Sequence, residues 1–213
     1  MNSHRFPDNA KRPARRARHS GLADFAFAMQ GLGTGPISLF GTERQRQAYL
    51  PPVIRGEAIA AFALSEPQAG SDVAGMRMKA VRDGDEWVIT GTKCWMSGVV
   101  QADWYCVFAK TGPTDSRRHE DITCFVVERD RPGVSVGRTD DKMGVRGVDT
   151  GELILDGVRV PDANVVGGIG GFRLAMLGLN AMRPIVAARG IGLAEGALMY
   201  AVDYVKERAA FGR

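Results

Sequence analysis

Two short stretches of the sequence combine hydroxyl groups, small residues and a large aromatic ring. Residues 62–72 read Phe-Ala-Leu-Ser-Glu-Pro-Gln-Ala-Gly-Ser-Asp, and residues 91–97 read Gly-Thr-Lys-Cys-Trp-Met-Ser. A wide flat ring flanked by hydroxyl and backbone N–H donors suits a planar heteroaromatic ligand, which stacks on the ring and hydrogen-bonds through its edge. The two stretches therefore predict a binding site for such a ligand.

The local structure of the first stretch follows from its proline and glycine. Proline lacks an N–H and cannot continue a central strand, so we expect an apolar strand that stops at Pro67. Gly70 permits a tight backbone path, and the resulting loop would present Ser65 and Ser71 beside the sheet. In the second stretch Trp95 is either the stacking ring of the site or an ordinary core tryptophan.

The remaining reactive side chains predict no other chemistry. The three cysteines, Cys94, Cys106 and Cys124, have no CxxC spacing and lie in apolar patterns, so we expect small buried side chains in a reducing compartment. No cluster of ligating residues indicates a metal, and no Ser–His or Cys–His pair is credible.

The formal charge of +4 is a property of the N-terminal tail. Residues 1–20 carry six Lys or Arg and one Asp, a net of +5, which leaves −1 for the rest. This tail is too polar to bury surface, so disorder is favoured over a transit peptide. No motif supports a nucleic-acid partner, and no apolar run approaches the ~18 residues of a membrane span.

The elements around the two stretches change character along the chain. A short helix is expected at 22–29, followed by a glycine-rich loop at 31–36. A second helix at 43–50 has a capping box formed by Thr42 and Gln45, and Pro51-Pro52 is expected to end it.

The centre of the chain carries strand patterns. Alternating or apolar runs occur at 87–89, 104–109, 122–127 and 152–155, with turn signals at 83–85, 131–133 and 156–157. Short strands without intervening helices indicate an antiparallel barrel or sandwich.

A single helical stripe of apolar residues follows at 172–208, and Pro184 should bend it. Such a helix needs partner helices, which the chain is not expected to supply. The predicted fold class is therefore α+β, a β domain with a short helical N-terminal segment and one long C-terminal helix. Its parts are a tail (1–20), an N-terminal helical remnant (21–57), the β domain (58–166) and the long helix (167–213).

The two stretches resemble motifs of the acyl-CoA dehydrogenase family of flavoproteins. So do Lys-Met-Gly-Val-Arg at 142–146, Leu-Asp-Gly-Val-Arg-Val-Pro at 155–161, Gly-Gly-Phe at 170–172 and Lys-Glu-Arg-Ala-Ala-Phe-Gly-Arg at 206–213. The six motifs keep the family's order and spacing from about Gly41 to Arg213. The resemblance implies FAD, held between barrel and helical bundle without a Rossmann fold.

The resemblance also assigns residues to the flavin. One wall of the site would be built from Phe62, Leu64, Ser65, Gly70 and Ser71. Trp95 would stack near the isoalloxazine ring, with Met96 beside it, and Ser97 would bond the edge of the ring. A neighbouring subunit would contribute Arg208, Ala210 and Phe211, which implies a homo-oligomer.

The acyl-CoA would contact Ser71, Leu179, Asn180, Met182 and Arg183. Arg183 interrupts an apolar stripe, so it needs either a ligand phosphate or an internal salt bridge. Asn180 stands where some members of the family have an acid.

The implied reaction is α,β-dehydrogenation of an acyl-CoA in fatty-acid or branched-chain catabolism. Electron-transfer flavoprotein would accept the electrons from the flavin. The protein would be located in the cytoplasm or, alternatively, in the mitochondrial matrix. Members of the family carry a catalytic Glu either in a later C-terminal segment or at the position that Met182 occupies here. Methionine cannot take a proton, so no catalytic residue is predicted in this sequence. The chain then resembles a middle fragment. An inactive relic or binding subunit and an acyl-CoA oxidase are the alternatives.

Overall fold

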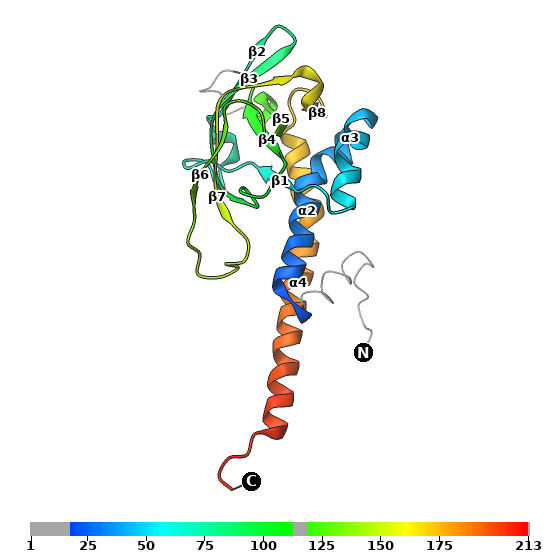
Figure 1. Cartoon of the computed structure of the whole chain (residues 1–213), viewed down its shortest axis with the longest axis vertical. Helices are drawn as coiled ribbons and strands as arrows, with labels where there is room; N and C mark the ends of the chain where they lie inside the picture. The colour runs from blue at the N-terminus through cyan, green and yellow to red at the C-terminus, as the bar shows by residue number, and fades with distance from the viewer. Residues whose placement is uncertain (1–17, 113–118, 213) are drawn as a thin grey trace. The chain divides into compact units, whose positions relative to one another are not determined.

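The computed structural model describes residues 18–112 and 119–212 (Figure 1). It divides into two compact units, one comprising Met29–Asn180 and the other combining Met1–Ala28 with Ala181–Arg213. All strands belong to the first unit. The disorder predicted for residues 1–20 falls, as far as residue 17, outside the described residues.

The helix α2 spans Gly21–Phe40 and contains the stretch 31–36 that was predicted as a glycine-rich loop. That prediction is wrong because Gly33 serves close packing rather than a turn. A Cβ on Gly33 would lie 2.5 Å from the carbonyl oxygen of Ala60, so only glycine lets the helix approach the strand that begins there. The Gln30 side chain accepts a hydrogen bond of 2.9 Å from the Ala60 amide at the same contact.

The helix α3 spans Glu43–Ile54 and begins with the predicted capping box. The Gln45 amide donates to Oγ1 of Thr42 at 3.2 Å, and the Thr42 amide donates to Oε1 of Gln45 at 2.9 Å. The prediction that Pro51-Pro52 ends the helix is wrong. Prolines remove only their own N–H donors, and both carbonyls still accept the amides of Arg55 and Glu57, so the helical turn continues past them.

The strands form one eight-stranded sheet with the order β6-β7-β3-β2-β4-β5-β8, and β1 also pairs with β4. Their bounds are β1 Ala60–Ala63, β2 Lys79–Asp83, β3 Glu86–Ser97, β4 Trp104–Lys110, β5 Ile122–Glu128, β6 Val134–Thr139, β7 Thr150–Pro161 and β8 Val165–Val166. Three short 3-10 helices are η1 (Val73–Gly75), η2 (His119–Asp121) and η3 (Asp162–Asn164).

The sheet is mixed rather than purely antiparallel. β4 pairs in parallel with β1 along 104–107 and with β2 at Lys110, whereas the other pairings are antiparallel. The α+β class is confirmed, and the two parallel pairings correct the expected antiparallel arrangement. The predicted turn at 83–85 lies between β2 and β3, and that at 131–133 lies between β5 and β6.

The third predicted turn, at Asp156-Gly157, is wrong. Both residues lie inside β7, where Ile89 and Gly91 of β3 pair with Val158 and Leu155. β7 therefore has one extra residue at this point, and Gly157 adopts a φ of +62°. The residue pair that is typical of a tight turn here forms a bulge that bends a long strand.

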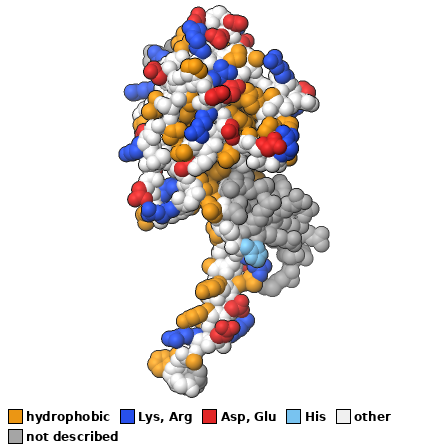
Figure 2. Space-filling model, viewed as in Figure 1, with side chains coloured by type: hydrophobic (Ala, Val, Ile, Leu, Met, Phe, Trp, Pro, Cys, Tyr) orange, Lys and Arg blue, Asp and Glu red, His pale blue; other side chains and the backbone are white. Residues whose placement is uncertain are grey.

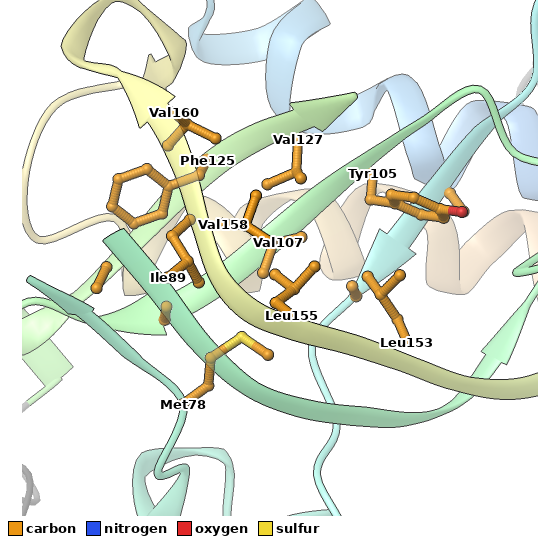
Figure 3. Packing of buried hydrophobic residues seen from close by; sticks show 14 of the residues in the cluster. Met78, Ile89, Tyr105, Val107, Phe125, Val127, Leu153, Leu155, Val158 and Val160 are labelled. Carbon is orange, nitrogen blue, oxygen red and sulfur yellow. The ribbon is translucent and has the colours of Figure 1, made fainter. Parts of the chain in front are cut away.

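Two buried clusters cover the two faces of β4 and β5, whose side chains are almost all buried. Figure 3 shows Val107 of β4 and Phe125 of β5 pointing into the same interior as Val158 of β7 and Ile89 of β3. The opposite faces contribute Phe108 and Ile122, among others, to a second cluster that contains residues of α2 and of the helix α4 (Phe172–Glu207). Because both faces of β4 and β5 are buried, the sequences of these strands are continuous apolar runs rather than alternating patterns.

The helix α4 spans Phe172–Glu207, close to its predicted bounds, with Pro184 inside it. In the second unit the chain does supply a partner, contrary to expectation. The Arg189 guanidinium lies 4.8 Å from the centroid of the Phe25 ring, and Arg18 pairs with Glu195 at 3.5 Å. The first turns of α2 therefore pack on α4.

Much of the C-terminal half of α4 nevertheless stays exposed. Figure 2 shows hydrophobic side chains alternating with charged ones along this segment, and Leu198, Tyr200 and Val205 are among the exposed residues. One 18-residue window of α4 reaches a mean hydropathy of 1.4, so this helix is long and apolar enough to cross a membrane by length and composition. Arg183 and Arg189 interrupt its apolar residues, so the predicted absence of an apolar run near 18 residues is not contradicted, and the absence of a membrane span stays a prediction.

A pair of glycine substitutions tests the packing of α2 on β1. We expect Gly33→Ala to destabilise the protein by about 1–3 kcal/mol, because the added Cβ meets backbone atoms that cannot move independently. Gly35→Ala, two residues on, would place its Cβ within 4 Å of no atom beyond its own helical neighbours, and the ring of Pro36 offsets the usual gain of Ala over Gly. This control should therefore change the stability by less than about 0.5 kcal/mol. Urea unfolding of both variants measures the difference, and an equal effect of the two substitutions would contradict the close approach.

Candidate functional site

Trp95 occupies an irregular position on β3. Lys93 and Met96 pair with Leu153 and Gly151 of β7, so β3 has one residue more than its partner over this segment. Trp95 lies in the resulting bulge with a φ of +54°, in the left-handed region that non-glycine residues rarely adopt. Its side chain is 56% exposed. The bulge thus turns a large aromatic ring away from the core towards solvent.

The loop between β1 and β2 begins with a tight turn. The amide of Glu66 donates to the Ala69 carbonyl at 3.1 Å, and the amide of Ala69 donates to the Glu66 carbonyl at 3.0 Å. Pro67 occupies the second position of this four-residue turn, where its fixed φ is favourable. The strand was predicted to stop at Pro67, and β1 already ends at Ala63, so that Pro67 lies in the turn that follows.

This loop lies against the bulge of β3. The Cys94 amide donates to the Ser65 carbonyl at 3.0 Å. A Cβ on Gly70 would lie 3.8 Å from Cζ3 of Trp95. Ser65 is half-buried, whereas Gly70 and Ser71 are exposed beside the ring. The two stretches predicted to form one site therefore do meet, with Ser65, Gly70 and Trp95 brought together.

Within the described part of the chain, the hydroxyls of Ser65 and Ser97 make no hydrogen bond, and the amides of Gly70 and Ser71 donate none. Those donors remain available to a ligand or to water. A half-exposed ring, small residues next to it and several unused donors fit a planar group with a polar edge.

A buried ion pair beneath this contact was missed by the sequence reasoning. Nζ of Lys93 lies 2.7 Å from Oε1 of Glu66, and both side chains are almost entirely buried. Each residue stands inside one of the two motifs, yet neither was assigned a role. A lysine that occupies an inward position of an apolar strand is the signal that could have found the pair, because such a charge requires a partner.

The surroundings of the pair decide the charge of the carboxyl group. Burial raises the pKa of Glu66, but the Lys93 ammonium and the amides of Arg77 and Met78 outweigh that effect, so its pKa lies below the ordinary value. Burial lowers the pKa of Lys93, and Glu66 opposes this shift only in part. The geometry, with donors surrounding the carboxylate, supports an ionised Glu66.

Other predicted flavin residues have side chains turned to the core. Met96 is buried in the cluster between β3, β4 and β7, and Leu64 is buried in the second cluster. Phe62 packs on Phe108 with ring centroids 5.1 Å apart. The buried Leu64 and Met96 could reach a ligand at the loop only through the main chain. Phe62 and Ser97 are half-buried. Their predicted contacts with a flavin stay predictions.

The predicted substrate residues lie on α4. Leu179 packs against the second cluster, and Asn180 is exposed. Met182 and Arg183 belong to the other unit, where Met182 is half-buried and Arg183 is exposed. Arg208, Ala210 and Phe211, assigned to a neighbouring subunit's flavin, are exposed after the end of α4, and Phe211 has a φ of +54°.

The three cysteines are free and buried, as predicted. Burial raises the pKa of the Cys94 and Cys124 thiols, which keeps them protonated and unreactive. No group of three or more His, Cys, Asp or Glu that could hold a metal ion occurs among residues 18–112 and 119–212.

Three family models match consecutive parts of the chain. They are the acyl-CoA dehydrogenase N-terminal domain at residues 15–57, the middle domain at 61–158 and the C-terminal domain at 170–213. The chain belongs to the acyl-CoA dehydrogenase family. The middle-domain match contains both stretches of the candidate site.

Curated relatives agree with the family models. An acyl-CoA dehydrogenase of Bacillus subtilis is 43% identical over 183 residues, which cover 85% of this chain and 48% of that protein. Cyclohexane-1-carbonyl-CoA dehydrogenase of Syntrophus aciditrophicus is 40% identical over 186 residues, which cover 87% of this chain and 48% of that protein. The chain spans about half the length of the curated relatives it matches.

Solved structures share the fold. A chain from the structure of the electron transferring flavoprotein of Acidaminococcus fermentans matches 98% of this chain and 58% of its own length, with a TM-score of 0.90 and 36% identity. Butyryl-CoA dehydrogenase of Megasphaera elsdenii matches 94% of this chain and 53% of its own, with a TM-score of 0.89 and 35% identity. An acyl-CoA dehydrogenase from Bacillus anthracis complexed with FAD matches 94% of this chain and 35% of its own length, with a TM-score of 0.86 and 34% identity.

The backbone of Trp95 gives a prediction that needs no ligand. Trp95→Gly should be more stable than Trp95→Ala by about 1 kcal/mol, because glycine relieves the left-handed backbone and both variants lose the same ring. The matched control is Val81, an exposed residue in regular β2. There Val81→Gly should be less stable than Val81→Ala by about 0.5–1 kcal/mol. The urea midpoints of the four variants test both pairs. The same order of stability for Gly and Ala at positions 95 and 81 would contradict the left-handed conformation of the bulge.

Proposed function

We propose that this chain forms the flavin-binding part of an FAD-dependent acyl-CoA dehydrogenase. The observation that carries the proposal is the contact between the loop at Gly70 and the half-exposed ring of Trp95, in a chain that matches three domains of the family. The FAD complex of the related protein from Bacillus anthracis supports the choice of cofactor.

The residues of the candidate site would bind and orient the flavin. The ring of Trp95 offers a stacking surface, and the hydroxyls of Ser65 and Ser97 offer hydrogen bonds to the polar edge of the isoalloxazine. Gly70 and Ser71 leave exposed amides for the pyrophosphate or the acyl-CoA. FAD, when bound, would supply the acceptor for a hydride. Hydrogen-bond donors to the thioester carbonyl would polarise it and make the α-proton of the acyl group more acidic.

We infer that the substrate is an acyl-CoA thioester. The names of relatives such as butyryl-CoA dehydrogenase and cyclohexane-1-carbonyl-CoA dehydrogenase support this class. Leu179, Asn180, Met182 and Arg183 are the proposed contacts on α4, with Arg183 for a CoA phosphate. The proposal assigns no catalytic base among the 213 residues, because Met182 cannot accept a proton and Glu195 is paired with Arg18.

We further propose a homo-oligomer of the whole protein, in which Arg208, Ala210 and Phe211 reach the flavin of a neighbouring subunit. A role in fatty-acid β-oxidation, an electron-transfer flavoprotein as acceptor and a cytoplasmic location complete the proposal. The match to a chain from an electron transferring flavoprotein structure supports the association with such flavoproteins. The C-terminal domain match at 170–213 favours protein packing, rather than a membrane, for the apolar surface of α4.

Flavin binding tests the role of Trp95. Trp95→Ala and Trp95→Gly should both weaken FAD binding by roughly tenfold, because stacking of a base on an aromatic side chain contributes about 1–3 kcal/mol. Val81→Ala, which removes another exposed apolar side chain, should leave the Kd for FAD unchanged. The measurement is quenching of FAD fluorescence on titration with folded protein, and an unchanged Kd in both Trp95 variants would remove the ring from the site.

The alternatives differ in what the bound flavin does. A dehydrogenase bleaches its flavin when butyryl-CoA is added without oxygen, whereas an oxidase also produces hydrogen peroxide in air. Because no base is assigned among the 213 residues, this assay applies to the whole protein, in which flavin that binds without bleaching would favour an inactive relic or a binding subunit. Absorbance at the flavin band and a peroxide assay on the purified protein separate the three.

A further inference from the structure

The buried Lys93–Glu66 ion pair joins the two halves of the candidate site. Lys93 lies on β3 two residues before Trp95, and Glu66 lies in the loop one residue after Ser65. Their side chains are 0% and 2% exposed, and the charged atoms are 2.7 Å apart. The pair is therefore adjacent to the candidate flavin contacts without itself reaching a ligand.

The hydrogen bonds of the pair are saturated. Nζ of Lys93 donates to the Leu64 carbonyl at 3.0 Å as well as to Glu66, and its third contact is Sδ of Met76 at 3.9 Å. An ammonium has three donors, so none is left for a ligand.

The carboxylate of Glu66 closes the base of the loop. Its Oε1 also accepts the Met78 amide at 3.1 Å, and its Oε2 accepts the Arg77 amide at 2.6 Å and Nε2 of Gln68 at 2.6 Å. One side chain thereby fixes the start of the loop, its end next to β2, and the neighbouring strand β3.

Stability alone does not account for such a pair. Removing two charges from water costs free energy that their mutual attraction often fails to return, and apolar replacements of buried pairs are frequently neutral or stabilising. A directional, saturated pair differs from an apolar contact in the precision with which it fixes the backbone. That backbone carries Ser65 on one side and Trp95 on the other.

We propose that Lys93 and Glu66 are positioning residues, which hold the loop 64–72 in register with the bulge of β3 so that Ser65 and Trp95 can bind the flavin together. This inference rests on the proposed function, since it names the cofactor of that site. The pair acts through the Leu64 carbonyl and the loop backbone rather than by contact with the cofactor.

The test uses a double variant that leaves no buried charge. Lys93→Met with Glu66→Gln keeps the side chains close in size and is expected to fold, because the Gln oxygen can still accept the Arg77 amide and only the Met78 amide loses its acceptor. Either single change would instead leave an unpaired buried charge. The 213-residue chain carrying both changes should bind FAD between about tenfold and a hundredfold more weakly, the range typical when outer partners of a bound metal are removed. The Kd is measured per folded molecule, with the folded fraction taken from thermal unfolding.

The matched control is Arg159→Met. Arg159 pairs with Asp83 at 2.7 Å and Glu86 at 3.1 Å on the exposed end of the same β2–β3 hairpin. Removing this exposed pair should leave the Kd for FAD within about twofold of the parent.

Amide hydrogen exchange of the protein without FAD separates this inference from the proposed function. In the double variant, peptides covering 64–78 and 93–97 should exchange faster, while those of β4 and β5 keep the exchange rates of the parent. Unchanged exchange at 64–78 and 93–97, or an unchanged FAD Kd in the folded variant, would overturn the positioning role. If the parent protein does not bind FAD, the proposed function is contradicted. The role of the pair in positioning a flavin site is then contradicted too, regardless of the exchange rates of the loop.

Discussion

The hydrogen bond from the Cys94 amide to the Ser65 carbonyl is the contact on which the candidate site depends. It connects a loop and a strand bulge, neither of which belongs to a regular sheet ladder at this point. A single exposed bond of this kind is weak, because water competes for both partners. Here the two bonded residues are the chain neighbours of Lys93 and Glu66, whose side chains form an ion pair that is itself buried from water. The backbone contact between loop and strand therefore has a buried charged contact next to it.

The topology of the sheet explains why the loop lies there. β1 and β2 follow each other along the same edge of β4, with β1 beside 104–107 and β2 reaching Lys110. Both run parallel to β4, but residues 64–78 lie between them while β4 advances only from Val107 to Lys110, so the chain leaves the edge after β1 and returns to it for β2. The excursion contains Pro67 and Gly70, and Glu66 closes it by accepting the Met78 amide. The loop that carries the candidate site thus lies between two strands paired to the same edge of β4.

Local patterns in the sequence predicted what local physics decides. The capping box at Thr42 and Gln45, the hairpin turn before β3 and the stop at Pro67 each depend on neighbouring residues. The predicted end of α3 at Pro51-Pro52 is a local prediction that is wrong, but other wrong predictions concern contacts distant in sequence. The stretch around Gly33 is helical because β1 packs against it, and Asp156-Gly157 forms a bulge because β3 pairs on both sides of it. The ion pair under the site was invisible for the same reason, since 27 residues separate its members.

The conformation of Trp95 argues for a ligand independently of the family. A left-handed backbone costs a non-glycine residue roughly 1–2 kcal/mol, and a half-exposed indole returns little of its possible burial energy. Glycine would satisfy the bulge at lower cost, so folding alone does not favour tryptophan at this position. A planar ligand covering the exposed ring would recover the missing burial energy, and strain of this kind clusters at functional sites. The strained backbone and the exposed ring of Trp95 thus agree with the proposed stacking role.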